Sequence, residues 1–225
     1  MLTTLILDFD GVVVESLPLK TAAFKKIFSF APPEHLDEII AFHLENGGMS
    51  RYDKYRYIYA NILREPLTPE QEERLASEYV GLIFDAMLTV PYVEGAEELL
   101  RDCSQRLPLY IVSATPEGEM REIARRRDLT KYFVRIYGSP KTKAECIREI
   151  LEETGASPDE ALFVGDAPND WDAARATGVR FVARIPPGDP NRFTDRPGVE
   201  GIVENLQELR GYLRGSVCSS RSRTP

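Results

Sequence analysis

Cysteine, histidine and tryptophan are scarce in this chain of 225 residues, which contains three Cys, two His and one Trp. Cys103, Cys146 and Cys218 are odd in number and far apart, so they indicate neither a disulfide framework nor a cysteine metal site. The amphipathic patterns around Cys103 and Cys146 favour buried core thiols over nucleophiles. We therefore expect a protein of a reducing, cytoplasmic compartment.

The chain also lacks long apolar runs and an excess of basic residues. No run approaches the ~20 apolar residues that a membrane helix needs, and no basic segment at the N-terminus suggests a secretory signal. Lys and Arg number 28 against 36 Asp and Glu, which gives a net charge of -8. This balance disfavours nucleic acid or an anionic membrane as the main partner. A small anionic substrate stays allowed, because one local pocket can be basic.

Short apolar runs alternate with amphipathic helical patterns along most of the chain. A continuous apolar run that ends at polar residues is typical of a buried strand in a parallel sheet. We therefore predict an α/β fold with a Rossmann-like parallel sheet. The predicted strands are 3–7, 109–113, 133–137, 161–164, 179–183 and 201–203.

One stretch, 17–90, breaks this alternation, because it contains helical patterns alone. An all-helical insertion after the first strand of an α/β domain indicates a cap or lid, with Thr68 and Pro69 as the start signal of its last helix. We divide the chain into an α/β core of 1–16 and 91–215, the cap, and a Ser- and Arg-rich tail, 216–225, predicted to be disordered. The predicted cap helices are 21–30, 34–45, 50–63 and 69–88.

Polar residues follow four of the predicted strands, at the edge of a parallel sheet where ligands bind. Four carboxylates at one edge repel one another unless a cation intervenes, and hard oxygen ligands suit Mg²⁺. A carboxylate can attack phosphorus, a second can transfer a proton, and a lysine can offset phosphoryl charge. The set therefore indicates metal-dependent phosphoryl transfer. Its members are Asp8, Asp10, Gly11, Ser113, Ala114, Lys141, Lys143, Asp166 and Asp170.

These residues resemble the motifs of the haloacid dehalogenase-like (HAD) hydrolase superfamily, in its C1-capped phosphatase and phosphoglucomutase branch. Asp8-Phe9-Asp10-Gly11 resembles the DxDG signature, and the segment from Gly165 to Asp170 resembles the GDxxxD motif. Ser113 and a lysine of 141–143 match the two weaker motifs. The resemblance covers roughly residues 4–212.

The resemblance implies a role for each matching residue. Asp8 would be the nucleophile and a metal ligand, and Asp10 the general acid/base, binding metal through its backbone carbonyl. Asp166 would complete the metal site, with Asp170 as a further ligand or a supporting partner. Gly11, Ser113, the amide of Ala114 and the lysine would hold the phosphoryl group.

The lysine motif departs from the pattern of the branch, because Lys141 and Lys143 are both candidates. We favour Lys143, which directly precedes the predicted helix 144–153, and keep Lys141 open. The second aspartate, Asp10, favours phosphoryl transfer over dehalogenation, because a halide leaving group needs no proton.

In the predicted cap, Gly47-Gly48 breaks one helix and Ser50 can begin the next. The corresponding loop of C1-capped relatives enters the active site, which implies substrate contacts here. The alternative is a solvated turn with exposed charges. The cap candidates are His43, Asn46, Gly47, Gly48, Arg51 and Lys54. Glu15 and Ser16 are interpreted as caps of the following helix.

We therefore predict a Mg²⁺-dependent hydrolase that acts on a small phosphorylated metabolite through an aspartyl-phosphate. Three alternatives stay open. A phosphomutase of sugar phosphates, similar to β-phosphoglucomutase, would have the same motifs. A phosphonate hydrolase would need an imine-forming cap lysine, for which Lys54 is the candidate. A catalytically idle metabolite-binding protein could also have this fold.

Overall fold

A parallel sheet of six strands, in the order β3-β2-β1-β4-β5-β6, forms the centre of the core. We describe residues 1–218 of a computed structural model. The register places Leu5 of β1 between Leu109 of β2 and Leu162 of β4. This order confirms the predicted Rossmann-like sheet and places β1, with its aspartates, at the middle. The strands are β1 Thr4–Leu7, β2 Leu109–Pro116, β3 Arg135–Ser139, β4 Ala161–Gly165, β5 Arg180–Arg184 and β6 Val199–Val203.

Helices cover both faces of the sheet because its side chains alternate between two apolar clusters. Leu5 and Leu7 belong to the cluster that contains residues of α5, α6 and α9, whereas Ile6 packs with residues of α7 and α8. The sheet is buried on both faces, as the continuous apolar runs predict. The core helices are α5 Ala96–Cys103, α6 Glu117–Arg126, α7 Lys143–Thr154, α8 Pro168–Thr177 and α9 Leu206–Cys218.

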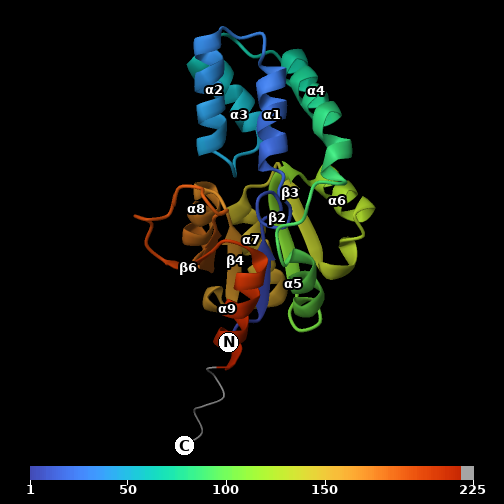
Figure 1. Cartoon of the computed structure of the whole chain (residues 1–225), viewed down its shortest axis with the longest axis vertical. Coiled ribbons are helices and arrows are strands. Elements are labelled where there is room, and N and C mark those ends of the chain that lie inside the picture. The colour runs from blue at the N-terminus through green and yellow to red at the C-terminus, as the bar shows by residue number, and fades with distance from the viewer. Residues whose placement is uncertain (219–225) are drawn as a thin grey trace, which may run out of the picture.

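The remaining helices gather at one end of the sheet, above the carboxyl ends of its strands (Figure 1). We call this group the cap. Aromatic side chains fill its interior, with Phe24 packed against Phe28, Tyr55 and Tyr79. Thr68 caps the last helix through a capping box with Gln71, as the start signal predicts. The cap consists of α1 Leu17–Ile27, α2 Pro33–Glu45, α3 Arg51–Tyr57, a π-helical segment Ile58–Leu63 and α4 Pro69–Met87.

The two connections between core and cap run side by side. Val14 and Tyr92 form an antiparallel bridge, and the amide of Glu15 donates to the carbonyl of Pro91 at 2.9 Å. Arg184 at the end of β5 fixes the first connection by donating to the Gly11 carbonyl at 3.1 Å and to the Glu15 carboxylate. The loop after Asp8 is therefore tied to the core where the cap begins.

Several predicted boundaries are wrong. α1 begins at Leu17 rather than at residue 21, and β2 continues to Pro116, which pairs with Ser139 beyond an irregularity. The predicted helix 50–63 changes from α- to π-helix after Tyr57. α9 continues to Cys218 and thus includes 216–218 of the predicted disordered tail, whereas 219–225 lie outside the described residues. Within residues 1–218, no helix has the length and apolar character of a membrane span.

Candidate active site

Three buried carboxylates meet where β1 and β4 end. The parallel pairing of Leu7 with Val164 places the following residues, Asp8 and Gly165, at the same level of the sheet. Each of Asp8, Asp166 and Asp170 has a carboxylate oxygen within 4.8 Å of the others. The structure thus brings together the acidic residues of the two motif-bearing strand ends.

Lys143 lies among these carboxylates. Its Nζ is 2.8 Å from Asp8 Oδ2 and 2.5 Å from Asp170 Oδ1. Thr142 fixes the start of α7 through a capping box with Glu145, which directs Lys143 into the site. Lys141, the other candidate, instead pairs with Glu149 at the surface, 2.5 Å away. The structure therefore places Lys143, and not Lys141, in contact with Asp8.

Asp170 organises the loop that follows β4. Its Oδ2 accepts hydrogen bonds from the backbone amides of Asp166 and Ala167, at 3.1 and 3.0 Å. Gly165 leaves the room that this arrangement needs, because a Cβ there would lie 2.3 Å from Asp170 Cβ. Its other oxygen, Oδ1, accepts from Lys143, and the side chain is fully buried. Asp170 therefore fixes both the loop that carries Asp166 and the position of Lys143.

The charges of this cluster fit a divalent cation. Burial raises the pKa of Asp8 to about 7, and repulsion from Asp170 and Asp10 adds to this effect. The positive charge of Lys143 opposes it but does not outweigh it. Burial and the neighbouring carboxylates raise the pKa of Asp166 well above its usual range. Burial lowers the pKa of Lys143, but Asp170 and Asp8 outweigh it and raise that pKa above its ordinary value. The single positive charge of Lys143 does not balance the three carboxylates. A hard divalent cation would neutralise the remaining charge, and carboxylate oxygens are the ligands that Mg²⁺ prefers.

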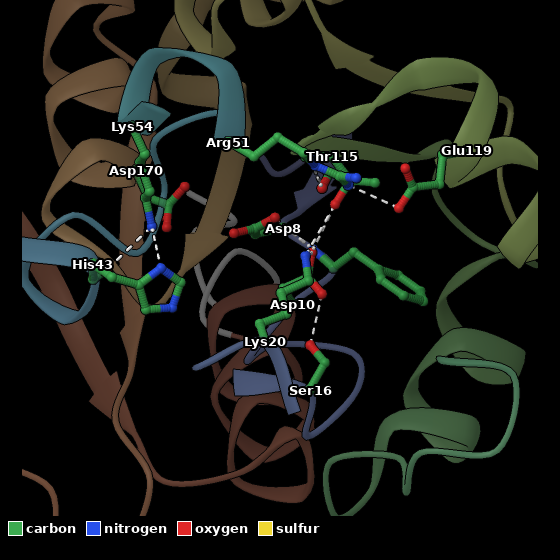
Figure 2. Close-up of polar contacts among 12 residues, drawn as sticks. Asp8, Asp10, Ser16, Lys20, His43, Arg51, Lys54, Thr115, Glu119 and Asp170 are labelled. Carbon is green, nitrogen blue, oxygen red and sulfur yellow. Dashed lines mark hydrogen bonds and ion pairs between the residues drawn. The ribbon is translucent and has the colours of Figure 1, made fainter. Parts of the chain in front are cut away.

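Asp10 lies beside this cluster in a separate hydrogen-bond network (Figure 2). Its Oδ1 accepts from Ser16 Oγ at 2.6 Å, and its Oδ2 accepts from Thr115 Oγ1 at 3.2 Å and pairs with Lys20 Nζ at 2.5 Å. Burial raises the pKa of Asp10, but Lys20 and the hydroxyl donors outweigh it and hold that pKa below its ordinary value. Ser16 therefore donates to Asp10, and its hydroxyl accepts no capping hydrogen bond from a backbone amide of α1, contrary to our prediction.

The end of β2 contributes three consecutive residues. The Ser113 hydroxyl accepts a hydrogen bond from the amide of Thr115 at 3.1 Å, while Ala114 and Thr115 line the cavity between core and cap. Gly11 lies opposite with a φ of +74°, and a Cβ there would be 2.5 Å from Asp166 Oδ2. This position therefore requires glycine both for its backbone conformation and for its approach to Asp166.

The cap closes a cavity of about 50 Å³ over Asp8, Asp10 and Asp166. Four of the cap candidates, His43, Gly47, Arg51 and Lys54, line it. Asn46 instead lines a neighbouring groove, and its side chain donates to the Phe42 carbonyl at 3.0 Å. Arg51 crosses from the cap to the core and pairs with Glu119 at 2.8 Å (Figure 2).

Several residues of the site lie outside the set that the sequence motifs predict. Lys20 and Thr115 meet Asp10 from separate elements, and Glu119 meets Arg51 from α6. Tyr79 of α4 lines the cavity and lies under Arg51, whose guanidinium carbon is 4.6 Å from the ring centre. None belongs to a motif, and each is brought in by the packing of an element that is distant in sequence.

The glycine pair of the cap loop lies against the core. A Cβ at Gly48 would lie 3.0 Å from Asn169 Cβ and 3.6 Å from Lys143 Nζ. We expect Gly48→Val to push the loop off the core and to lower kcat/KM by about tenfold or more, because small displacements around a site are costly. Gly81→Ala in α4 is the control, since a Cβ there meets no described atom within 4 Å. Activity unchanged in Gly48→Val would show that the loop need not seat on the core.

With this fold and site described, comparison with known proteins identifies the class. A family model of the haloacid dehalogenase-like hydrolases matches residues 2–178. The chain therefore belongs to the HAD-like hydrolase family, and the predicted enzyme class is confirmed.

Relatives in sequence and structure agree with this assignment. The chain is 25% identical over 209 residues to phosphoglycolate phosphatase 1 of Pseudomonas aeruginosa, covering 90% of this chain and 76% of that protein. It is 22% identical over 182 residues to a phosphorylated carbohydrates phosphatase of Thermotoga maritima, covering 79% and 82%. CbbY of Rhodobacter sphaeroides, solved with phosphate, has a TM-score of 0.71 at 18% identity and covers 93% of this chain and 96% of its own. This structural likeness supports the fold.

Proposed function

We propose that the chain is a Mg²⁺-dependent phosphomonoester hydrolase that acts on a small phosphorylated metabolite through an aspartyl-phosphate. The observation that carries the proposal is the position of Asp8. Its carboxylate is buried at the centre of the sheet edge, in contact with Lys143, within the acidic cluster and under the cap. A nucleophilic carboxylate, a cation and a second acid are the groups that phosphoryl transfer needs.

In the first step, an Asp8 carboxylate oxygen attacks phosphorus and the bond to the ester oxygen breaks. Asp8 Oδ1 is oriented by the Phe9 amide at 2.6 Å, and Oδ2 by Lys143. Lys143 also offsets charge on the phosphoryl oxygens, and the Ser113 and Ala114 segment holds them. Bound Mg²⁺, held by Asp8, Asp166 and the Asp10 carbonyl, would supply further neutralisation of that charge.

Asp10 acts as the general acid and then as the general base. It gives a proton to the departing alcohol and then takes one from the water that hydrolyses the aspartyl-phosphate. In the free protein Lys20 keeps Asp10 ionised. A phosphate dianion placed beside Asp10 raises its pKa, because like charges disfavour ionisation. Ser16 and Thr115 hold the carboxylate in place through this exchange.

The names of the relatives support the substrate class. The two sequence relatives described above are named for phosphoglycolate and for phosphorylated carbohydrates, both small phosphate esters. The cavity of about 50 Å³ suits a small leaving group. The cap would exclude bulk water during the reaction and open to release product.

The test is a panel of phosphate esters assayed for released inorganic phosphate, with Mg²⁺ and after treatment with EDTA. We expect phosphate release that EDTA abolishes and added Mg²⁺ restores. Conversion of a sugar phosphate to its isomer without phosphate release would show a phosphomutase instead. Ligand binding without turnover of any ester would show an idle binding protein.

A further inference from the structure

Three cationic side chains line the cavity and a fourth, Lys143, lies beside it; three of these four are paired with carboxylates. Lys20 pairs with Asp10, Arg51 with Glu119, and Lys143 with Asp8 and Asp170. Lys54 differs, because no carboxylate of residues 1–218 lies within ion-pair distance of it. It is nevertheless only 3% exposed and lines the cavity.

His43 and an apolar wall hold Lys54 in this position. Lys54 Nζ lies 3.2 Å from His43 Nδ1 and 3.1 Å from the His43 carbonyl oxygen (Figure 2). The His43 ring packs on Phe24 at 4.1 Å between centres, and Lys54 Nζ is 5.4 Å from the centre of the same ring. Burial, with Lys54 and Lys20 nearby, lowers the pKa of His43 to about 3, so the imidazole stays neutral.

This arrangement costs stability and offers no counterion. Burial and the neighbouring Lys20 lower the pKa of Lys54 to about 7, and the opposing effect of Asp166 and Asp10, which are not paired with it, is smaller. Buried cations are normally paired, because an uncompensated charge in an apolar surrounding is unfavourable. The two acceptors on His43 orient the amine but carry no charge. Among the cations around the cavity, Lys54 is therefore the one that the described residues leave without a charged partner.

We propose that Lys54, oriented by His43, forms a subsite for a second negatively charged group on the substrate, so that the substrate is the phosphate ester of a small acid. The inference rests on the proposed function, because it assigns the leaving group of that reaction. Arg51 is not available to bind the second negative group of the substrate, because its guanidinium is already paired with Glu119. The cavity is small, so the part of the substrate that carries the second charge is short. Several sequence relatives are named for phosphoglycolate, which is the phosphate ester of a small acid, and one is named for phosphorylated carbohydrates.

The test compares three esters of similar length: 2-phosphoglycolate, 2-hydroxyethyl phosphate and ethane-1,2-diol bisphosphate. We expect Lys54→Met to lower kcat/KM for 2-phosphoglycolate by about 10- to 100-fold, the effect of losing one charged hydrogen bond. The same variant should lower kcat/KM for 2-hydroxyethyl phosphate by a much smaller factor, because this ester carries no second charged group. A greater loss on the bisphosphate than on 2-phosphoglycolate would identify phosphate as the group that Lys54 binds.

Lys26→Met is the matched control, because Lys26 is an exposed lysine of α1. Lys54→Met removes a buried charge, so we expect its Tm at pH 7 to be no lower than that of the parent. An equal fall in activity on the charged and uncharged esters would overturn the proposal.

A binding measurement separates this proposal from the proposed function. In the presence of Mg²⁺, 2-phosphoglycolate should raise the Tm of the parent more than that of Lys54→Met, whether or not turnover occurs. If the parent hydrolyses none of the esters but this difference persists, the hydrolase proposal fails and the anion subsite stands. If the parent hydrolyses esters but both proteins show the same Tm shift, the subsite is refuted and the hydrolase proposal stands.

Discussion

Asp8→Asn should abolish Mg²⁺-dependent phosphate release, with a fall in kcat of about 10⁴-fold or more, as expected when a covalent nucleophile is removed. Asn keeps the shape of the side chain and can still accept from the Phe9 amide, but its amide oxygen does not form an acyl-phosphate. Asp85→Asn is the control, since Asp85 is an exposed acid of α4. Retention of metal-dependent activity in Asp8→Asn would contradict the assignment of the nucleophile.

The same variant should fold as well as the parent, because it relieves repulsion within the acidic cluster. The pKa of Asp8 is raised from 3.8 to about 7 in the metal-free protein. Between these values the folded state holds a proton that the unfolded state has lost, so the stability of the parent falls as pH rises from about 4 to 7. Asp8→Asn should show a weaker decline over this window. Thermal unfolding in EDTA measures the difference.

Lys143→Met should lower both stability and activity, and its effect on activity should be second to that of Asp8→Asn. Lys143 is 7% exposed and contacts both Asp8 and Asp170. Removing one partner of a buried ion pair leaves uncompensated charge, which typically costs about 3–5 kcal/mol. We expect a loss of that order in the free energy of unfolding of the metal-free protein and a loss of activity of at least about 100-fold.

Lys141→Met is the matched control for this substitution, two residues earlier in the chain. Lys141 pairs with Glu149 at the surface, and exposed pairs contribute about 0–1 kcal/mol. The double variant Lys143→Met/Asp170→Asn should recover part of the lost stability, because it removes one of the stranded charges. Equal effects of the two lysine substitutions on chemical denaturation and turnover would contradict the structural assignment of Lys143.

The positions of Asp8, Asp166 and Lys143 could be predicted because each follows a strand of a parallel sheet. The apolar runs identify the strands, and parallel pairing brings their ends to one edge. Choosing between Lys141 and Lys143 needed the structure, because the capping box at Thr142 sets the direction of the first turn of α7.

The surroundings of Asp10 could not be predicted in the same way. Thr115 is separated from Asp10 by 105 positions, and Lys20 lies on a cap helix whose start was predicted four residues too late. The local pattern at Ser16 favoured a helix cap, but its hydroxyl donates to Asp10. Contacts between elements depend on packing angles and side-chain directions that periodicity does not contain.

Chemical trapping of the covalent intermediate tests the central claim most directly. The protein, turning over a phosphate ester with Mg²⁺, is quenched with hydroxylamine, which converts an acyl-phosphate to a hydroxamate. Peptide mass spectrometry then locates the modified residue. Our account predicts a substrate-dependent hydroxamate on Asp8 that is missing in Asp8→Asn. Turnover with a hydroxamate on another residue would contradict it.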